Sequence, residues 1–181
     1  MLKKLDNLEI YQNGLFFLSL GGIGEIGANC YLYGCDGKWI MIDLGITFAD
    51  EKHPGVDLLV PKIDFIEKIQ DDLVAIIISH GHEDHAGAVA FFADKIHCPV
   101  YATSFAKLLI ENRLNEFGKL DKIDIRELDT QKKLKLDNFN LEFFETTHSI
   151  PQPNAIVLNT SYGNLLHTAD WKIDLSPTLG K

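Results

Sequence analysis

Four side chains that can bind a metal ion lie close together in the chain: His80, His82, Asp84 and His85. They follow an apolar run, Leu73 to Ile78, which is typical of a strand buried on both faces. Imidazole nitrogen and carboxylate oxygen together suit zinc, and also manganese or iron. A solvated polar loop would explain any one of these residues alone, but the spacing H-x-H-x-D-H favours a metal site.

This spacing after a hydrophobic strand resembles the metal-binding signature of the metallo-β-lactamase superfamily of hydrolases. Two later residues could complete such a site, because each follows a predicted strand: His148 and Asp170. Alone, each has a simpler explanation, a hydrogen-bonded histidine or a turn carboxylate. Active residues from separate strands commonly gather at one edge of a sheet, so we expect them to join the first cluster.

Together these residues fit a plan for two divalent ions, most simply zinc, with manganese as the alternative. The expected ligands are His80, His82 and His148 for one metal and Asp84, His85 and a bridging Asp170 for the other. Such ions lie roughly 3.5–4 Å apart and share a water that becomes hydroxide, the expected nucleophile. The expected catalytic residues are Asp84, which orients the hydroxide or takes its proton, and His85. We identify no general acid for the leaving group.

The elements that must position these side chains follow from the apolar pattern. Strands are predicted at Gly14–Leu20, Ala28–Gly34, Lys38–Leu44, Leu73–Ile78, Pro99–Ala102, Lys122–Leu128, Lys132–Leu136, Leu141–Glu145, Asn154–Ser161 and Leu165–Thr168. Helices are predicted at Lys62–Gln70, Ala86–Ile96 and Thr103–Phe117. This order predicts a mixed α/β layer design in which helices cover one face of a sheet.

Three other features have competing interpretations. The glycines of Gly22-x-Gly24-x-x-Gly27 match the dinucleotide fingerprint, but a strand follows them where the fingerprint needs a helix, so a flexible loop beside a cleft is favoured. Asp43 either supports a metal ligand or caps the turn after its strand. His53 lies in an irregular segment, Ile46–Val60, and is interpreted as a surface residue.

Composition narrows the class of protein. With 181 residues, 46% of them hydrophobic, the chain suits one domain with a substantial core. A net charge of −9 argues against broad non-specific nucleic-acid binding, although not against a local site. The 3 cysteines form no C-x-x-C pair and predict no disulfide framework. The polar N-terminus and the lack of long apolar runs predict a soluble, cytoplasmic protein without a membrane partner.

The order of the motifs resembles ribonuclease J, a β-CASP branch of the superfamily. The matching stretches are Gly21–Asn29, Ile42–Gly45, Pro54–Asp57, Ser79–Gly87, Thr147–Pro151 and His167–Lys172. The resemblance implies an α+β fold, a metallo-β-lactamase-like αββα sandwich. It also implies an RNA substrate, with phosphodiester hydrolysis from the 5′ end, internally, or both.

The resemblance also implies missing parts. In that family a β-CASP domain follows the segment that matches Asp170, and the second half of the catalytic domain then supplies another His ligand to the second metal. Residues 1–181 therefore correspond to an N-terminal portion of the domain, without the β-CASP insertion and the C-terminal half. His53, His97 and His167 lie elsewhere in order. We expect a nearly complete first metal site and a second site that lacks one ligand.

Two alternatives remain open. The chain could be a small-molecule hydrolase on the same scaffold, acting on a thioester or a lactone. It could also be a non-catalytic fragment that binds the missing half or a second copy of itself through an exposed apolar surface.

Overall fold

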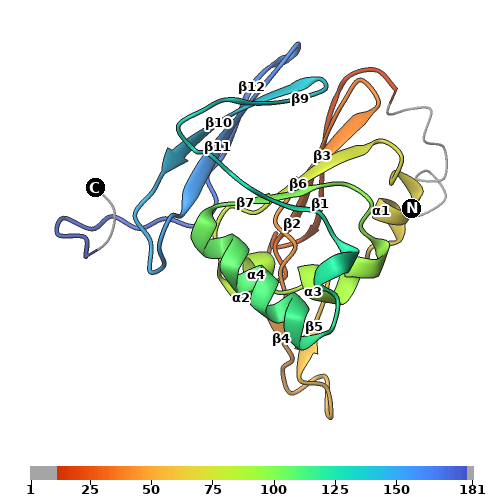
Figure 1. The fold of residues 1–181 in the computed structure, drawn as a ribbon, viewed down its shortest axis with the longest axis vertical. Coiled ribbons are helices and arrows are strands. Elements are labelled where there is room, and N and C mark those ends of the chain that lie inside the picture. The colour runs from red at the N-terminus through yellow and green to blue at the C-terminus, as the bar shows by residue number, and fades with distance from the viewer. Residues whose placement is uncertain (1–11, 179–181) are drawn as a thin grey trace.

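Two β-sheets stack face to face, and short helices cover the outer side of the larger sheet (Figure 1). The computed structural model describes residues 12–178. The larger sheet has the strand order β1-β2-β3-β6-β7-β8. Its strands are β1 (Leu15–Gly21), β2 (Cys30–Cys35), β3 (Lys38–Ile42), β6 (Leu73–Ile77), β7 (Val100–Ala102) and β8 (Ile125–Glu127).

The smaller sheet is antiparallel throughout and has the order β12-β11-β10-β9. Its strands are β9 (Leu134–Leu136), β10 (Phe139–Glu145), β11 (Asn154–Thr160) and β12 (Gly163–His167). A separate two-stranded hairpin is formed by β4 (Thr47–Phe48) and β5 (Leu58–Leu59).

The helical layer consists of short segments. These are α1 (Asp64–Lys68), α2 (Glu83–Ala86), α3 (Val89–Phe92), α4 (Ser104–Glu116) and the 3₁₀ turns η3 (Ala93–Lys95) and η4 (Leu120–Lys122). Their apolar side chains form one core with the outer face of the larger sheet. In the part of the chain that the structure describes, no helix is long and apolar enough to cross a membrane.

The strand β6 lies at the centre of both cores. Successive side chains of a strand point to opposite faces, so Ile76 packs under the helices and Ile77 packs against the smaller sheet. Both side chains are fully buried. The predicted two-faced burial of this strand is confirmed, and it explains why the run contains no polar residue.

The strand directions bring several loops to one edge. Strands β3, β6, β7 and β8 are parallel, so their carboxyl ends meet at the same edge of the larger sheet. The β10–β11 loop reaches this edge from the smaller sheet, because the backbone N–H of Asn154 donates to the carbonyl of Ser79 at 3.2 Å. Side chains from both sheets can therefore meet beyond β6.

Several predicted elements differ from the structure. The single helix predicted over Ala86–Ile96 is wrong, because the chain breaks into α2, α3 and η3. The break follows from tertiary contacts: the N–H of Ala88 donates to the carbonyl of Leu44 at 3.0 Å. The predicted strand Lys122–Leu128 starts only at Ile125, and Ile46–Val60 contains the β4–β5 hairpin.

Other predictions are confirmed. The strand β2, not a helix, follows the glycine loop. The hairpin turn between β2 and β3 has positive φ at both Asp36 (47°) and Gly37 (79°), as a type I′ turn requires. The prediction about the polar N-terminal residues lies outside the described part of the chain.

Candidate metal centre

The loop after β6 carries the first two histidines. His80 is fully buried, and His82 lies nearer the surface. A Cβ atom at Gly81 would stand 2.9 Å from the Cδ1 of Leu109 and 3.3 Å from the Cα of Ala106, so the loop lies directly against α4. A larger residue here would require Leu109 and α4 to shift slightly, so glycine suits the close approach of the two segments.

Three histidines form the first group. His82 Nδ1 lies 3.1 Å from His80 Nε2 and 3.1 Å from His148 Nε2. Two ligands held at 2.0–2.1 Å from a tetrahedral zinc ion are about 3.3 Å apart, so the three nitrogens are close to the separation that zinc needs. The structure thus brings together the three residues expected for the first metal.

The second group joins His85 and Asp170 to His80, with one ligand atom of each within 4.8 Å of the others. The two oxygens of Asp170 face different groups: Oδ1 lies 3.4 Å from His85 Nε2, and Oδ2 lies 3.5 Å from His148 Nε2. This is the placement that a bridging carboxylate needs.

Asp84 lies at the margin of the second group. Its Oδ2 is 3.6 Å from His85 Nε2 and accepts a hydrogen bond from the Asn29 amide at 3.3 Å. A cavity of about 230 Å³ opens at this place, lined by His85 and Asp170 among other residues. Asp84 and Asp170 are half-exposed, so both can meet a molecule from solvent.

Asp43 contacts the Nδ1 atom of His85 directly and that of His80 through Ser79. Its Oδ2 lies 2.7 Å from His85 Nδ1 and accepts from the Ser79 hydroxyl at 2.8 Å, while Oδ1 accepts from the Ser79 N–H. The Ser79 oxygen in turn lies 3.0 Å from His80 Nδ1. The Nδ1 atoms of both histidines are thus engaged, which leaves both Nε2 atoms for a metal. Of the two roles considered for Asp43, these contacts favour support of His85, one of the expected ligands.

The charges around the group follow from this burial. Burial and the neighbouring charge of His85 lower the pKa of His80 to about 3, so its imidazole is neutral, as a metal ligand must be. Burial alone would lower the pKa of His85, but the Asp43 and Asp170 carboxylates outweigh it and raise that pKa to about 10. The hydrogen bond and charge of His85 hold the pKa of Asp170 at about 2.

Asn29 contacts the candidate site, although sequence reasoning did not single it out. Its Nδ2 lies 3.0 Å from the Asp84 carbonyl and 3.0 Å from His85 Nε2, and its Oδ1 accepts from the Tyr31 hydroxyl at 2.8 Å. The only available signal was its place at the end of the glycine-rich stretch. The contact itself spans 55 residues of sequence.

The remaining histidines lie outside the two groups. His53 is exposed and pairs with Asp50 at 2.8 Å, which confirms its surface position, and His97 is exposed. His167 is buried, with Nδ1 3.0 Å from the Tyr33 hydroxyl and Nε2 4.0 Å from Asp43 Oδ2. It lines the same cavity as His85 and Asp170 but is not a member of either metal-competent group.

Comparisons with known proteins identify the family of the chain. The family model described as the metallo-beta-lactamase superfamily matches residues 23–171. Ribonuclease J of Sinorhizobium meliloti is 42% identical over 92% of this chain, and ribonuclease J of Thermus thermophilus is 33% identical over 94%. The chain spans only 30% and 31% of the lengths of these two relatives.

A solved structure shows the same fold. The metallo-beta-lactamase fold protein YhfI from Bacillus subtilis superposes with a TM-score of 0.57 at 17% identity, covering 85% of this chain and 61% of YhfI. The expected α+β class and metallo-β-lactamase-like sandwich are confirmed. Three of the four layers of an αββα sandwich lie within residues 12–178: the helices and the two sheets.

Proposed function

Because the chain belongs to the metallo-beta-lactamase superfamily of metal-dependent hydrolases, we propose that it carries the metal centre of a ribonuclease J-like enzyme that hydrolyses phosphodiester bonds in RNA. The observation that carries this proposal is the 42% identity to a ribonuclease J along 92% of the chain. The position of cleavage in the RNA is also part of the proposal: the enzyme would cleave from the 5′ end, internally, or both.

The proposed ligands are the residues that the fold brings together. His80, His82 and His148 would hold the first ion, and Asp84 with His85 would hold the second, with Asp170 shared between them. Zinc is the proposed metal because imidazoles dominate the set, and manganese is the alternative because of the carboxylates. Bound ions would supply an activated water and stabilise charge on a phosphoryl oxygen.

The chain's own groups would then orient and deprotonate the attacking water. Asp84 lies beside His85 Nε2 and is half-exposed, so it can accept a proton from a water at that position. Asn29 holds Asp84 and His85 together, and Asp43 keeps the His85 ring in one orientation. These contacts place the reacting groups before substrate arrives.

The two metal positions should differ in their affinity for an ion. Three imidazoles surround the first, whereas the second has one imidazole of its own and two half-exposed carboxylates. We propose that the second ion binds more weakly and that a further ligand, from a C-terminal half or a second copy, completes it. The cytoplasm is the proposed compartment, which suits the free thiols of Cys30, Cys35 and Cys98.

The direct test is an RNA assay on the 181-residue chain, alone and with a separately produced C-terminal portion of a relative. A 5′-monophosphorylated RNA labelled at its 3′ end would be incubated with zinc or manganese. We expect weak cleavage by the chain alone, stronger cleavage with the added portion, and loss of both after Asp84→Ala or chelation. His97→Ala is the matched control, because His97 is exposed and outside both groups.

Parallel assays with a thioester and a lactone separate the alternatives. Turnover of either compound without RNA cleavage would assign the same centre to a small-molecule hydrolase. Binding of the C-terminal portion without turnover of any substrate would favour a non-catalytic fragment. RNA cleavage that survives Asp84→Ala would contradict the proposed mechanism.

A further inference from the structure

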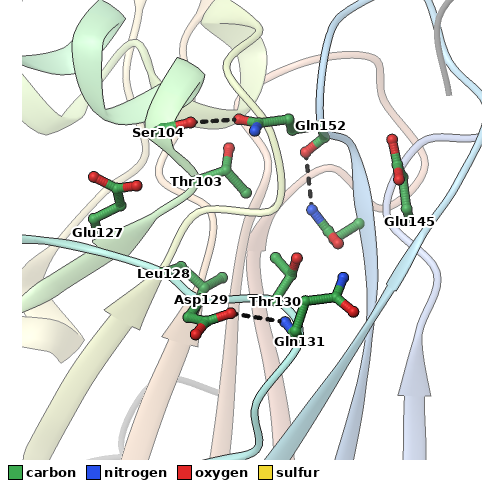
Figure 2. A pocket seen from close by; sticks show the side chains of 10 residues that line it. Thr103, Ser104, Glu127, Leu128, Asp129, Thr130, Gln131, Glu145 and Gln152 are labelled. Atoms are coloured by element: carbon green, nitrogen blue, oxygen red, sulfur yellow. Dashed lines mark hydrogen bonds between the residues drawn. The ribbon is translucent and has the colours of Figure 1, made fainter.

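A second cavity lies one loop away from the metal centre. It measures about 570 Å³ and is bounded by the start of α4, the β8–β9 connection and the ends of β10 and β11. Figure 2 shows Thr103 and Ser104 on one side of it, with Asp129 and Gln131 on the other. The loop of residues 146–153 carries both His148 of the histidine cluster and Gln152 of this lining.

Two buried polar atoms in the lining have no hydrogen-bond partner among the described residues: Thr103 Oγ1 and Asn154 Oδ1. Both residues are only 2% exposed. The Asn154 amide is held by its Nδ2, which donates to the Gln152 carbonyl at 2.8 Å, so Oδ1 is the acceptor left over. Buried polar groups in proteins are normally satisfied, so two unpartnered oxygens beside one cavity are candidate contacts for a polar ligand.

The start of α4 does not provide an anion site. A helix N-terminus attracts phosphate when its N–H groups are free. Here the Gln152 side-chain carbonyl accepts both from the Phe105 N–H at 3.0 Å and from the Ser104 hydroxyl at 3.1 Å. Thr103 precedes the helix but makes no side-chain capping bond. These two donors at the start of α4 are therefore already occupied and do not form a phosphate site.

The charge of the lining is negative. It includes Glu127, Asp129 and Glu145 and contains no basic side chain. Asp129 is paired with Lys132 at 2.7 Å, whereas Glu127 and Glu145 form no ion pair within the described residues. These carboxylates do not form a metal-ligating group, since both groups found in residues 12–178 lie around His80. The lining thus offers hydrogen-bond acceptors and negative charge, without the geometry of a metal site.

We propose that this cavity binds an organic cation rich in hydrogen-bond donors, an alkylguanidinium or an alkylammonium group. The cation would donate to Asn154 Oδ1 and the Thr103 hydroxyl at the buried end and pair with Glu127 and Glu145 at the open end. This chemistry could come from an arginine side chain or from a free polyamine. The proposal does not depend on the metal or on RNA cleavage.

The test is a titration of the ¹⁵N-labelled chain with agmatine, spermidine or neutral N-butylurea, followed by NMR. We expect agmatine to shift the side-chain amide signals of Asn154 and Gln131 saturably, with a Kd of about 1 mM or tighter. The double variant Glu127→Gln/Glu145→Gln should weaken binding about tenfold. Thr103→Val should also weaken it, and because Thr103 makes no capping bond the helix should keep its stability.

The double variant Glu25→Gln/Glu51→Gln is the matched control, since both residues are exposed and neither lines the cavity, and the variant also removes two negative charges. It should leave the Kd within about twofold. Binding of agmatine but not spermidine would support the proposal and indicate an arginine-like ligand. Tighter binding of spermidine would also support the proposal and indicate a polyamine ligand. The proposal is overturned if neither cation binds, if N-butylurea binds equally well, or if the cavity variants leave the Kd unchanged.

Discussion

The carboxylate of Asp43 lies 2.7 Å from the Nδ1 of His85, and the two side chains are 0% and 2% exposed. In the same chain Asp50 and His53 form a pair of similar length, 2.8 Å, but this pair is on the surface. The buried pair orients a histidine whose other nitrogen faces Asp170, whereas the surface pair orients nothing in the described site. The two pairs therefore provide a matched comparison of what a buried carboxylate contributes.

Asp43→Asn should weaken metal binding at the His85 position by about 10- to 100-fold, because an amide does not select the same imidazole proton position. The measurement is a competition between the chain and a coloured chelator for zinc. Asp50→Asn is the control and should leave metal affinity unchanged, since that pair is exposed. Equal affinities for the two variants would contradict the supporting role of Asp43.

Gly45→Ala should destabilise the fold by about 2–3 kcal/mol or more, because the new Cβ would overlap the backbone carbonyl group of Asp84. The backbone of α2 must then shift away from the segment after β3. Denaturant unfolding measures the loss. Gly55→Ala is the comparison: its φ of 81° makes alanine strained, but nothing lies within 4 Å. It should cost only about 1 kcal/mol.

Zinc should raise the thermal stability of the chain. At a free concentration about 100 times the Kd, binding stabilises by about 2.7 kcal/mol, which corresponds to roughly 5–10 °C in Tm for a domain of this size. His82→Ala should abolish most of this shift, because His82 Nδ1 contacts both other histidines of the first group. His97→Ala should keep it. An equal shift in both variants would place the tight zinc site elsewhere.

Stability should fall as the solution becomes alkaline. Burial raises the pKa of the Cys98 thiol from 9.0 to about 12. The unfolded chain therefore loses this proton near pH 9 while the folded chain keeps it, so the stabilisation is complete below pH 9 and is lost as pH rises toward 12. Between these values each such group contributes a slope of about −1.4 kcal/mol per pH unit.

Cys98→Ala isolates this contribution. Unfolding free energies of the two proteins would be measured from pH 8 to pH 11. The variant should be less stable at pH 8, because it leaves a small cavity, but its stability should decline less steeply above pH 9. Parallel declines for the two proteins would mean that other groups govern the alkaline transition.

The sequence predicted the parts of the site that depend on strand ends. Apolar runs marked the buried strands, and His80, His148 and Asp170 were expected at one edge because they follow such runs. The structure brings these three residues together. For His80 the pattern was sufficient because a strand buried on both faces leaves few alternatives for the polar residues that follow it, whereas β10 and β12 are partly exposed.

Contacts between distant segments could not be predicted in the same way. The helix predicted from Ala86 is broken because the N–H of Ala88 donates to the carbonyl of Leu44. The helix propensities of the local residues do not predict a contact with so distant a segment. Asn29 and His167 belong to the surroundings of the site only through neighbours 55 and 134 residues away. Asp43 had two plausible roles because its partners were unknown. Each of these features could be recognised only from the three-dimensional structure.

The first histidine group also has a mechanical consequence. His82 follows the larger sheet and His148 belongs to the smaller one, and the two are 66 residues apart in the chain. An ion held by both would link the two sheets in the folded chain and would be released on unfolding, so it would stabilise the closed sandwich in proportion to the metal available. Metal supply would then regulate the lifetime of this protein, because an unclamped sandwich would open sooner to proteases.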